Sequence, residues 1–207
     1  MKSPPFPPEE LAKALAVIRA GGVVAFPTET YYGLAVDPFN PEALSRLFAL
    51  KHRPPDKPVL TLIERREQLA LLARRVPELY PPLMDAFWPG PLTLVFEAVP
   101  ALPALLTGST GTIGVRISSH PIARRLVAAA GQPLTATSAN YSGQPPAVSP
   151  AEVMAQFGPR VDFVVQGGST PGGGGSTLVG LSGNDLVELR SGVIPFAAIL
   201  DQARKRV

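Results

Sequence analysis

Residues 23–33 read VVAFPTETYYG. The run Val23–Phe26 is apolar and is bounded by glycine and proline, which predicts a short buried strand. The polar run Thr28–Tyr32 follows it and would therefore lie where this strand ends, at the edge of a sheet. Functional sites of α/β proteins gather at such strand ends, so this segment is the first candidate site.

The elements around this strand predict a mixed α/β fold. Residues 7–20 have apolar side chains at helical spacing and end at glycine, and Asn40 with Pro41 caps a second helix that ends near Lys51. Further strands are expected over 59–63, 92–97, 112–117, 134–137, 161–165, 176–179 and 185–189, and further helices over 65–75, 78–87, 121–130, 150–157 and from about 195. Because these elements follow no regular βαβ rhythm, we expect an α/β (α+β) fold with a twisted mixed sheet flanked by helices. No repeat or long linker divides the chain, so we expect a single domain over residues 1–207.

The composition excludes several kinds of chemistry. The chain has no cysteine and two histidines, which leaves no thiolate nucleophile, no disulfide and no histidine-only metal cage. No apolar run reaches the ~18 residues of a membrane helix, and no signal-peptide segment is present, so we expect a cytoplasmic protein without a membrane partner. Of the 19 basic residues 14 are arginine, which favours phosphate or carboxylate ligands, although adaptation to heat or codon usage would give the same excess.

Most standard catalytic motifs are missing. There is no GxxxxGK[ST] loop, no GxGxxG after the first strand, no HExxH and no GxSxG, which argues against P-loop enzymes, dehydrogenases and hydrolases. Polar clusters remain at the ends of predicted elements, at 28–32, 51–57, 116, 138–140, 176–177 and 190. Taken singly, each has an ordinary structural explanation, such as a helix cap or a turn.

Seven segments, taken in order, resemble the threonylcarbamoyl-AMP synthase (YrdC-like) family over residues 8–195: FPTETYYGL, KHRPPDKP, FWPGPLTLV, GVRISSHP, TSANYSGQPP, GGSTLV and ELRSG. The KxR element (Lys51, Arg53) and the SxN element (Ser138, Asn140) are the most characteristic pair. The resemblance implies a concave basic cavity and an enzyme that joins L-threonine, bicarbonate and ATP into threonylcarbamoyl-AMP, with release of pyrophosphate. A separate transferase would then modify an adenosine of tRNA. The resemblance also implies the short form of the family, without a C-terminal extension domain.

The resemblance also implies roles for individual residues. It implies ATP contacts from Lys51, Arg53, Lys57, Thr112, Ser138, Asn140 and Arg190, and threonine contacts from Thr30, Tyr32, Arg116, Ala136 and Ser176. Lys51, Arg53, Ser138 and Asn140 would be the catalytic set. Because this reaction forms no covalent enzyme intermediate, catalysis would rest on positioning and charge neutralisation. Mg²⁺ is expected to enter with the ATP phosphates, since the sequence has no cluster of carboxylates to hold it.

Several residues qualify this assignment. The chain departs from the common family pattern at five positions, Tyr31, Leu62, Ser118, Pro146 and Gly180, which leaves open how the threonine and adenine sides are lined. Glu29 is the one acidic candidate near the site. In an extended KxR, His52 would point away from its two neighbours, so we do not expect it to be a general base. His120 precedes a proline and is expected to pack or to cap a helix.

Two other function classes remain open. A non-enzymatic module that binds tRNA or double-stranded RNA would suit a chain of net charge +3, although no aromatic stacking strand is evident. A carbamoyltransferase inside a multidomain maturation protein would be expected to carry cysteine zinc motifs, which this chain lacks. Threonine-dependent release of pyrophosphate would distinguish the synthase from the binding module.

Overall fold

The computed structural model describes residues 6–205. Its elements, in chain order, are α1 (Pro8–Arg19), β1 (Val24–Pro27), β2 (Tyr32–Ala35), α2 (Pro41–Lys51), β3 (Thr61–Leu62), the 3-10 helix η1 (Arg66–Leu71), α3 (Tyr80–Phe87), β4 (Leu92–Glu97), α4 (Ala104–Thr107), β5 (Thr112–Arg116), α5 (Pro121–Ala130), β6 (Leu134–Thr135), β7 (Thr137–Ser138), α6 (Pro150–Phe157), the 3-10 helix η2 (Gly158–Arg160), β8 (Phe163–Val164), β9 (Thr177–Ser182), β10 (Asp185–Arg190) and α7 (Phe196–Arg204).

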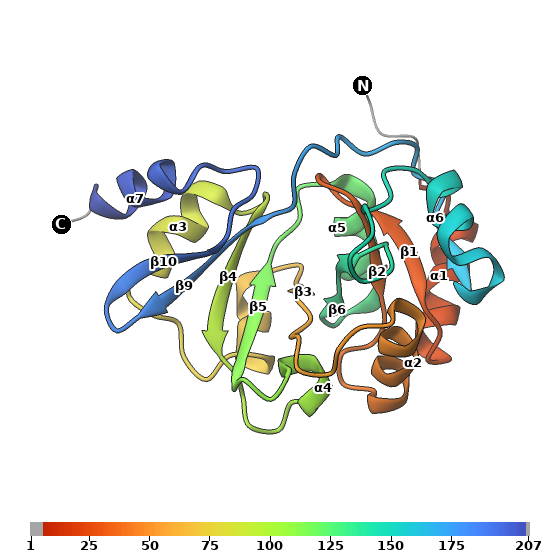
Figure 1. The fold of residues 1–207 in the computed structure, drawn as a ribbon, viewed down its shortest axis with the longest axis horizontal. Coiled ribbons are helices and arrows are strands. Elements are labelled where there is room, and N and C mark those ends of the chain that lie inside the picture. The colour runs from red at the N-terminus through yellow and green to blue at the C-terminus, as the bar shows by residue number, and fades with distance from the viewer. Residues whose placement is uncertain (1–5, 206–207) are drawn as a thin grey trace.

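The strands form two mixed sheets (Figure 1). The smaller sheet has the order β7-β2-β1-β8, in which β1 pairs antiparallel with β2 and parallel with β8. The larger sheet has the order β10-β9-β4-β5-β3-β6 and also contains both kinds of pairing. The expected mixed α/β fold is confirmed, with its strands divided between two sheets.

The segment 134–138 joins the two sheets. One strand was expected over 134–137, but β6 pairs with β3 of the larger sheet and β7 pairs with β2 of the smaller one. Ala136 lies between them and donates its N–H to the Leu60 carbonyl at 2.9 Å. A short peptide therefore holds the two sheets at a fixed spacing beside the predicted SxN element.

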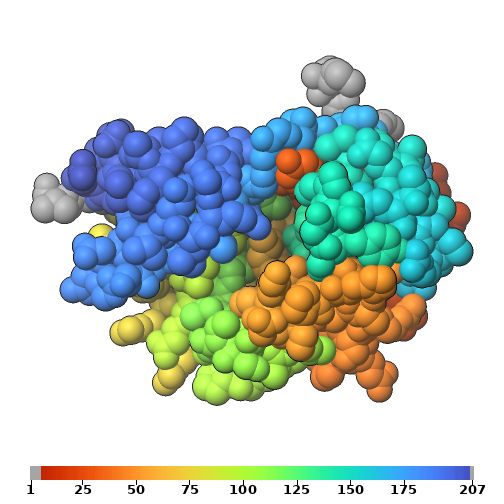
Figure 2. Space-filling view, viewed as in Figure 1, coloured from red at the N-terminus to blue at the C-terminus, as the bar shows by residue number. Residues whose placement is uncertain are grey.

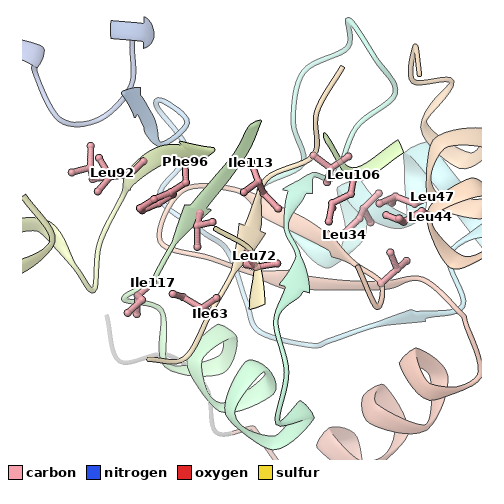
Figure 3. Close-up of a cluster of buried hydrophobic side chains, with 14 of the residues drawn as sticks. Leu34, Leu44, Leu47, Ile63, Leu72, Leu92, Phe96, Leu106, Ile113 and Ile117 are labelled. Carbon is pink, nitrogen blue, oxygen red and sulfur yellow. The ribbon is translucent and has the colours of Figure 1, made fainter. Parts of the chain in front are cut away.

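Helices cover the smaller sheet on both faces, as the apolar run at its centre predicts. Along β1, Ala25 belongs to the main core, whereas Val24 and Phe26 face a second cluster beneath α1 and α5. Figure 3 shows the main core running from Leu34 and Leu44 to Phe96 and Ile113 of the larger sheet. On the far side of that sheet, α3 packs against α7 (Figure 1).

Several predicted boundaries change for local reasons. The helix expected over 65–75 is only the short η1, because Arg74 donates its N–H to the Glu97 carbonyl at the end of β4 and leaves the helical path. The helix expected from residue 78 begins at Tyr80. The strands expected over 59–63 and 161–165 shorten to β3 and β8, and the strand expected over 176–179 lengthens to β9. The Asn40 cap is confirmed, since its side chain accepts from two backbone N–H groups.

The part of the chain that the structure describes contains no helix long and apolar enough to cross a membrane.

Candidate functional site

A cavity of about 520 Å³ opens between the two sheets. Its walls come from the β1–β2 turn, β5, the glycine-rich segment before β9, and the end of β10. Figure 2 shows the hollow at the centre of one face, between the C-terminal part of the chain and the segments around α2 and β7. Nine of the twelve residues predicted for the site line this cavity: Thr30, Tyr32, Arg53, Thr112, Arg116, Ala136, Ser138, Ser176 and Arg190.

Arg53, Arg116 and Arg190 bring three positive charges to this cavity. Burial lowers the pKa of all three guanidinium groups. Proximity contributes as well, because Arg190 lowers the pKa of Arg53 and Arg116 lowers the pKa of Arg190. Positive charges that are desolvated and repel one another favour an anionic ligand, whose binding would relieve both costs.

Arg116 is the deepest of the three arginines. Only 3% of its side chain is exposed, and its Nη1 lies 2.9 Å from Oε1 of Glu29. The other carboxylate oxygen of Glu29 accepts a hydrogen bond from Ser118 Oγ. The Arg116 atoms Nε and Nη1 have no hydrogen-bond partner among the described residues. The ion pair with Glu29 therefore leaves N–H groups of the guanidinium available to a ligand.

Arg190 owes its direction to an irregularity in β10. The pairing with β9 shifts register between Glu188 and Arg190, and both Leu189 and Arg190 line the cavity as a result. Arg190 as a whole is exposed, but its Nη2 donates to the carbonyl and the hydroxyl oxygen of Ser176, at 2.8 and 3.0 Å. Ser176 Oγ also forms a 2.7 Å hydrogen bond with Thr93 Oγ1, which connects the segment before β9 to β4.

Arg53 is held from the other side of the cavity. Its Nε donates to the Lys57 carbonyl at 3.1 Å and its Nη2 to the Pro58 carbonyl at 2.6 Å. Lys57 is exposed and does not line the cavity, so it contributes a backbone carbonyl to the site in this structure. Its predicted contact with ATP stays a prediction.

Lys51 and Asn140 stand behind the cavity wall. Lys51 is 1% exposed, and its Nζ donates to the carbonyls of Ser138 and Asn140 at 2.5 and 2.7 Å. Asn140 Nδ2 donates to the carbonyls of Tyr141 and Gln144, while its Oδ1 accepts from Ser138 Oγ at 2.6 Å. The two elements of the family pattern are therefore in direct contact, and Ser138 is the member that reaches the cavity.

The expected extended KxR conformation is wrong. Lys51 is the last residue of α2 and His52 has φ 51°, the left-handed conformation of a helix C-cap. His52 is nevertheless exposed and does not line the cavity, because its ring stacks on Tyr141 with centroids 5.1 Å apart. His120 caps α5 as expected, since its Nδ1 accepts from the Ile122 N–H at 3.3 Å.

Two of the five departures from the family pattern, Tyr31 and Pro146, line the cavity. Leu62 is fully buried in the smaller core cluster, Gly180 accommodates Leu189, and Ser118 contacts Glu29.

Sequence reasoning missed the apolar wall formed by Leu60, Val95, Leu178 and Leu189. Strand alternation indicates which of these residues share a face, but the face that opens onto a cavity depends on how the two sheets pack.

The residues that line the cavity offer no carboxylate or imidazole ligand for a metal ion. None of its lining residues is an aspartate or glutamate, and the described residues contain no group of three or more His, Asp or Glu side chains that could hold a metal. Glu29 is already engaged by Arg116 and Ser118.

Comparison with known proteins gives consistent matches. The Sua5/YciO/YrdC family model, described as telomere recombination, matches residues 16–192. A threonylcarbamoyl-AMP synthase of Pyrococcus abyssi is 40% identical over 186 residues, which cover 90% of this chain and 55% of the relative. The synthase of Halorhodospira halophila is 41% identical over 160 residues, 77% of this chain and 84% of the relative. The crystal structure of P. abyssi Sua5 complexed with L-threonine superposes with a TM-score of 0.90 at 38% identity, covering 94% of this chain and 57% of that chain. The chain thus spans little more than half the length of the P. abyssi protein.

Proposed function

The chain belongs to the Sua5/YciO/YrdC family, and from this premise we propose that it is an L-threonylcarbamoyladenylate synthase. The proposed substrates are L-threonine, bicarbonate and ATP, and the products are threonylcarbamoyl-AMP and pyrophosphate. The observation that carries the proposal is the convergence of three arginine side chains on one cavity that no aspartate or glutamate lines.

The threonine side would lie at the bottom of the cavity. Arg116 would bind the α-carboxylate, because a guanidinium can donate two parallel hydrogen bonds to a carboxylate. Thr30, Tyr32, Ser176 and the backbone of Ala136 surround it and offer neutral polar groups. The Tyr32 side chain is fully buried and its hydroxyl donates to the Gly168 carbonyl at 2.7 Å, so the contact of Tyr32 with threonine stays a prediction.

The ATP side would lie nearer the mouth. Arg53 and Arg190 would neutralise the triphosphate, with Ser138 and Thr112 as hydrogen-bonding partners. The apolar wall of Leu60, Val95, Leu178 and Leu189 would suit the adenine ring of ATP. Mg²⁺ would enter on the phosphate oxygens, since no aspartate or glutamate lines the cavity.

Two bond-forming steps follow from this arrangement. Bicarbonate gives CO₂ and hydroxide, and the threonine nitrogen adds to the carbon of CO₂. The hydroxide takes a proton from this nitrogen and leaves as water, which gives a carbamate. A carbamate oxygen then attacks the α-phosphorus of ATP, and the bond to pyrophosphate breaks. Both partners are anions, so the arginines would act by holding them in line against their mutual repulsion and by stabilising charge as it moves to the leaving group.

The product is a mixed anhydride, which a separate transferase would consume to modify an adenosine of tRNA. We place the reaction in the cytoplasm, where tRNA and ATP occur together. Binding of tRNA or double-stranded RNA to the free protein stays a prediction.

The proposed function predicts that ATP is converted to AMP and pyrophosphate only when both L-threonine and bicarbonate are present. Pyrophosphate release measured with each component omitted in turn, together with mass detection of threonylcarbamoyl-AMP, tests this. Equal turnover without threonine would contradict the synthase assignment. Tight binding of tRNA without any turnover would favour the RNA-binding module instead.

A further inference from the structure

Ser118 and Glu29 form a contact that the family resemblance does not explain. Ser118 lies two residues beyond the end of β5 and is 2% exposed. Its hydroxyl donates to Glu29 Oε2 and accepts the backbone N–H of His120 at 3.2 Å. The hydroxyl is therefore used as donor and as acceptor, and its proton is directed at the carboxylate.

Glu29 lies behind Arg116 as seen from the cavity. Arg116 lines the cavity, whereas Glu29 does not, and 13% of the Glu29 side chain is exposed. Its Oε1 lies 2.9 Å from Arg116 Nη1 but makes no hydrogen bond there. His120 is the other titratable group near this carboxylate. The Glu29 carboxylate thus contacts Ser118 through one oxygen and faces Arg116 with the other.

We propose that Ser118 is a positioning residue that acts through Glu29 to aim Arg116 at the carboxylate of the substrate. With Ser118 in place, one carboxylate oxygen is engaged and Arg116 keeps donors for the ligand. Without it, Glu29 Oε2 becomes a buried acceptor with no partner and turns toward the guanidinium. The paired hydrogen bonds that result would occupy Arg116 and withdraw it from the cavity.

This inference rests on the proposed function, since it concerns the threonine side of the same cavity. The test compares Ser118→Ala with Ser118→Thr, which keeps the hydroxyl, and with Ser119→Ala, which alters the exposed neighbour. We expect Ser118→Ala to raise the KM for threonine and its calorimetric Kd about 5- to 20-fold, because a buried acceptor loses its donor. The KM for ATP and kcat should change less than about twofold, Ser118→Thr should restore threonine binding, and Ser119→Ala should have no effect.

A double-mutant cycle with Glu29→Gln separates positioning from general destabilisation. If Ser118 acts only through Glu29, Ser118→Ala should have no further effect on threonine binding in the Glu29→Gln background. An unchanged threonine KM in Ser118→Ala, an equal rise in the ATP KM, or fully additive effects would overturn the proposal. If the wild-type protein binds threonine without releasing pyrophosphate, the proposed reaction fails, while the calorimetric Kd values still decide the role of Ser118. If it binds no threonine, both proposals fail.

Discussion

At the scale of single residues, Arg53 and His52 are neighbours in the chain with opposite surroundings. Arg53 lines the cavity and is fixed by two backbone carbonyls, whereas His52 stacks on Tyr141 outside it. We expect Arg53→Ala to lose about 2–4 kcal/mol of transition-state stabilisation, the scale for removing a preorganised donor to developing charge. His52→Ala is the matched control and should lose far less. Measured kcat/KM values compare the two, and a loss from His52→Ala as large as that from Arg53→Ala would reopen a general-base role for the histidine.

Lys51 predicts a pH dependence of stability. Burial, assisted by the charge of Arg53, lowers the pKa of Lys51 from 10.5 to about 7. Between pH 7 and 10 the unfolded chain therefore holds a proton that the folded protein has released, so the free energy of unfolding should rise with pH by up to about 1.4 kcal/mol per pH unit. Lys51→Met removes this dependence.

Denaturant unfolding at pH 7 and pH 9 provides the measurement. The stability difference between the wild-type protein and Lys51→Met should grow in favour of the wild type as the pH rises. Lys57→Met removes an exposed lysine of the same segment and controls for the loss of one positive charge. If the difference in unfolding free energy between the two proteins is the same at pH 7 and pH 9, the prediction is wrong. The carbonyls of Ser138 and Asn140 would then keep Lys51 protonated in the folded protein.

At the scale of elements, the end of β10 and the segment before β9 must lie very close together. A Cβ on Gly192 would collide with backbone atoms of Gly175, Ser176 and Thr177, and backbone cannot yield as a flexible side chain can. This contact also carries the hydrogen bond from the Val193 N–H to the Gly175 carbonyl at 3.0 Å. The approach of these two backbones sets the distance between Arg190 and Ser176 at the cavity wall.

Gly192→Ala should therefore lower the free energy of unfolding by about 1–3 kcal/mol, as overpacking does, and should raise the KM for both substrates. Gly174→Ala is the control, since the nearest atom to its Cβ would be 3.5 Å away in ordinary contact. Urea unfolding and steady-state kinetics measure the two effects. Wild-type behaviour of Gly192→Ala would show that β10 can move away without affecting the site.

At the scale of the whole molecule, the cavity is formed by residues of both sheets. Ser138 belongs to the smaller sheet and Thr30 to the turn between β1 and β2, whereas Thr112, Arg116 and Arg190 come from the larger sheet. A ligand that fills the space would contact both sheets at once. The segment 134–138 belongs to both, so the spacing of the two walls is set by covalent connection as well as by packing.

The sequence by itself determined most of the elements and most members of the site. Asn40 and His120 cap helices where their side chains predict it, and the apolar run 24–27 is a strand buried on both faces, because these features depend on neighbours within a few residues. Ordered motifs of a known family identified nine of the residues that line the cavity.

Only the tertiary structure decided which of these residues meet. Ser118 and Glu29 are 89 positions apart, and Lys51 and Asn140 are likewise 89 apart, so no local pattern could have paired them. The sequence predicts Lys51 to be a phosphate ligand, but in the structure its Nζ donates to the backbone carbonyls of Ser138 and Asn140. Helix caps and strands follow from short-range sterics and hydrogen bonding, whereas the partners of a buried charge follow from the packing of distant segments, which excludes water and leaves that charge only the groups the fold brings to it.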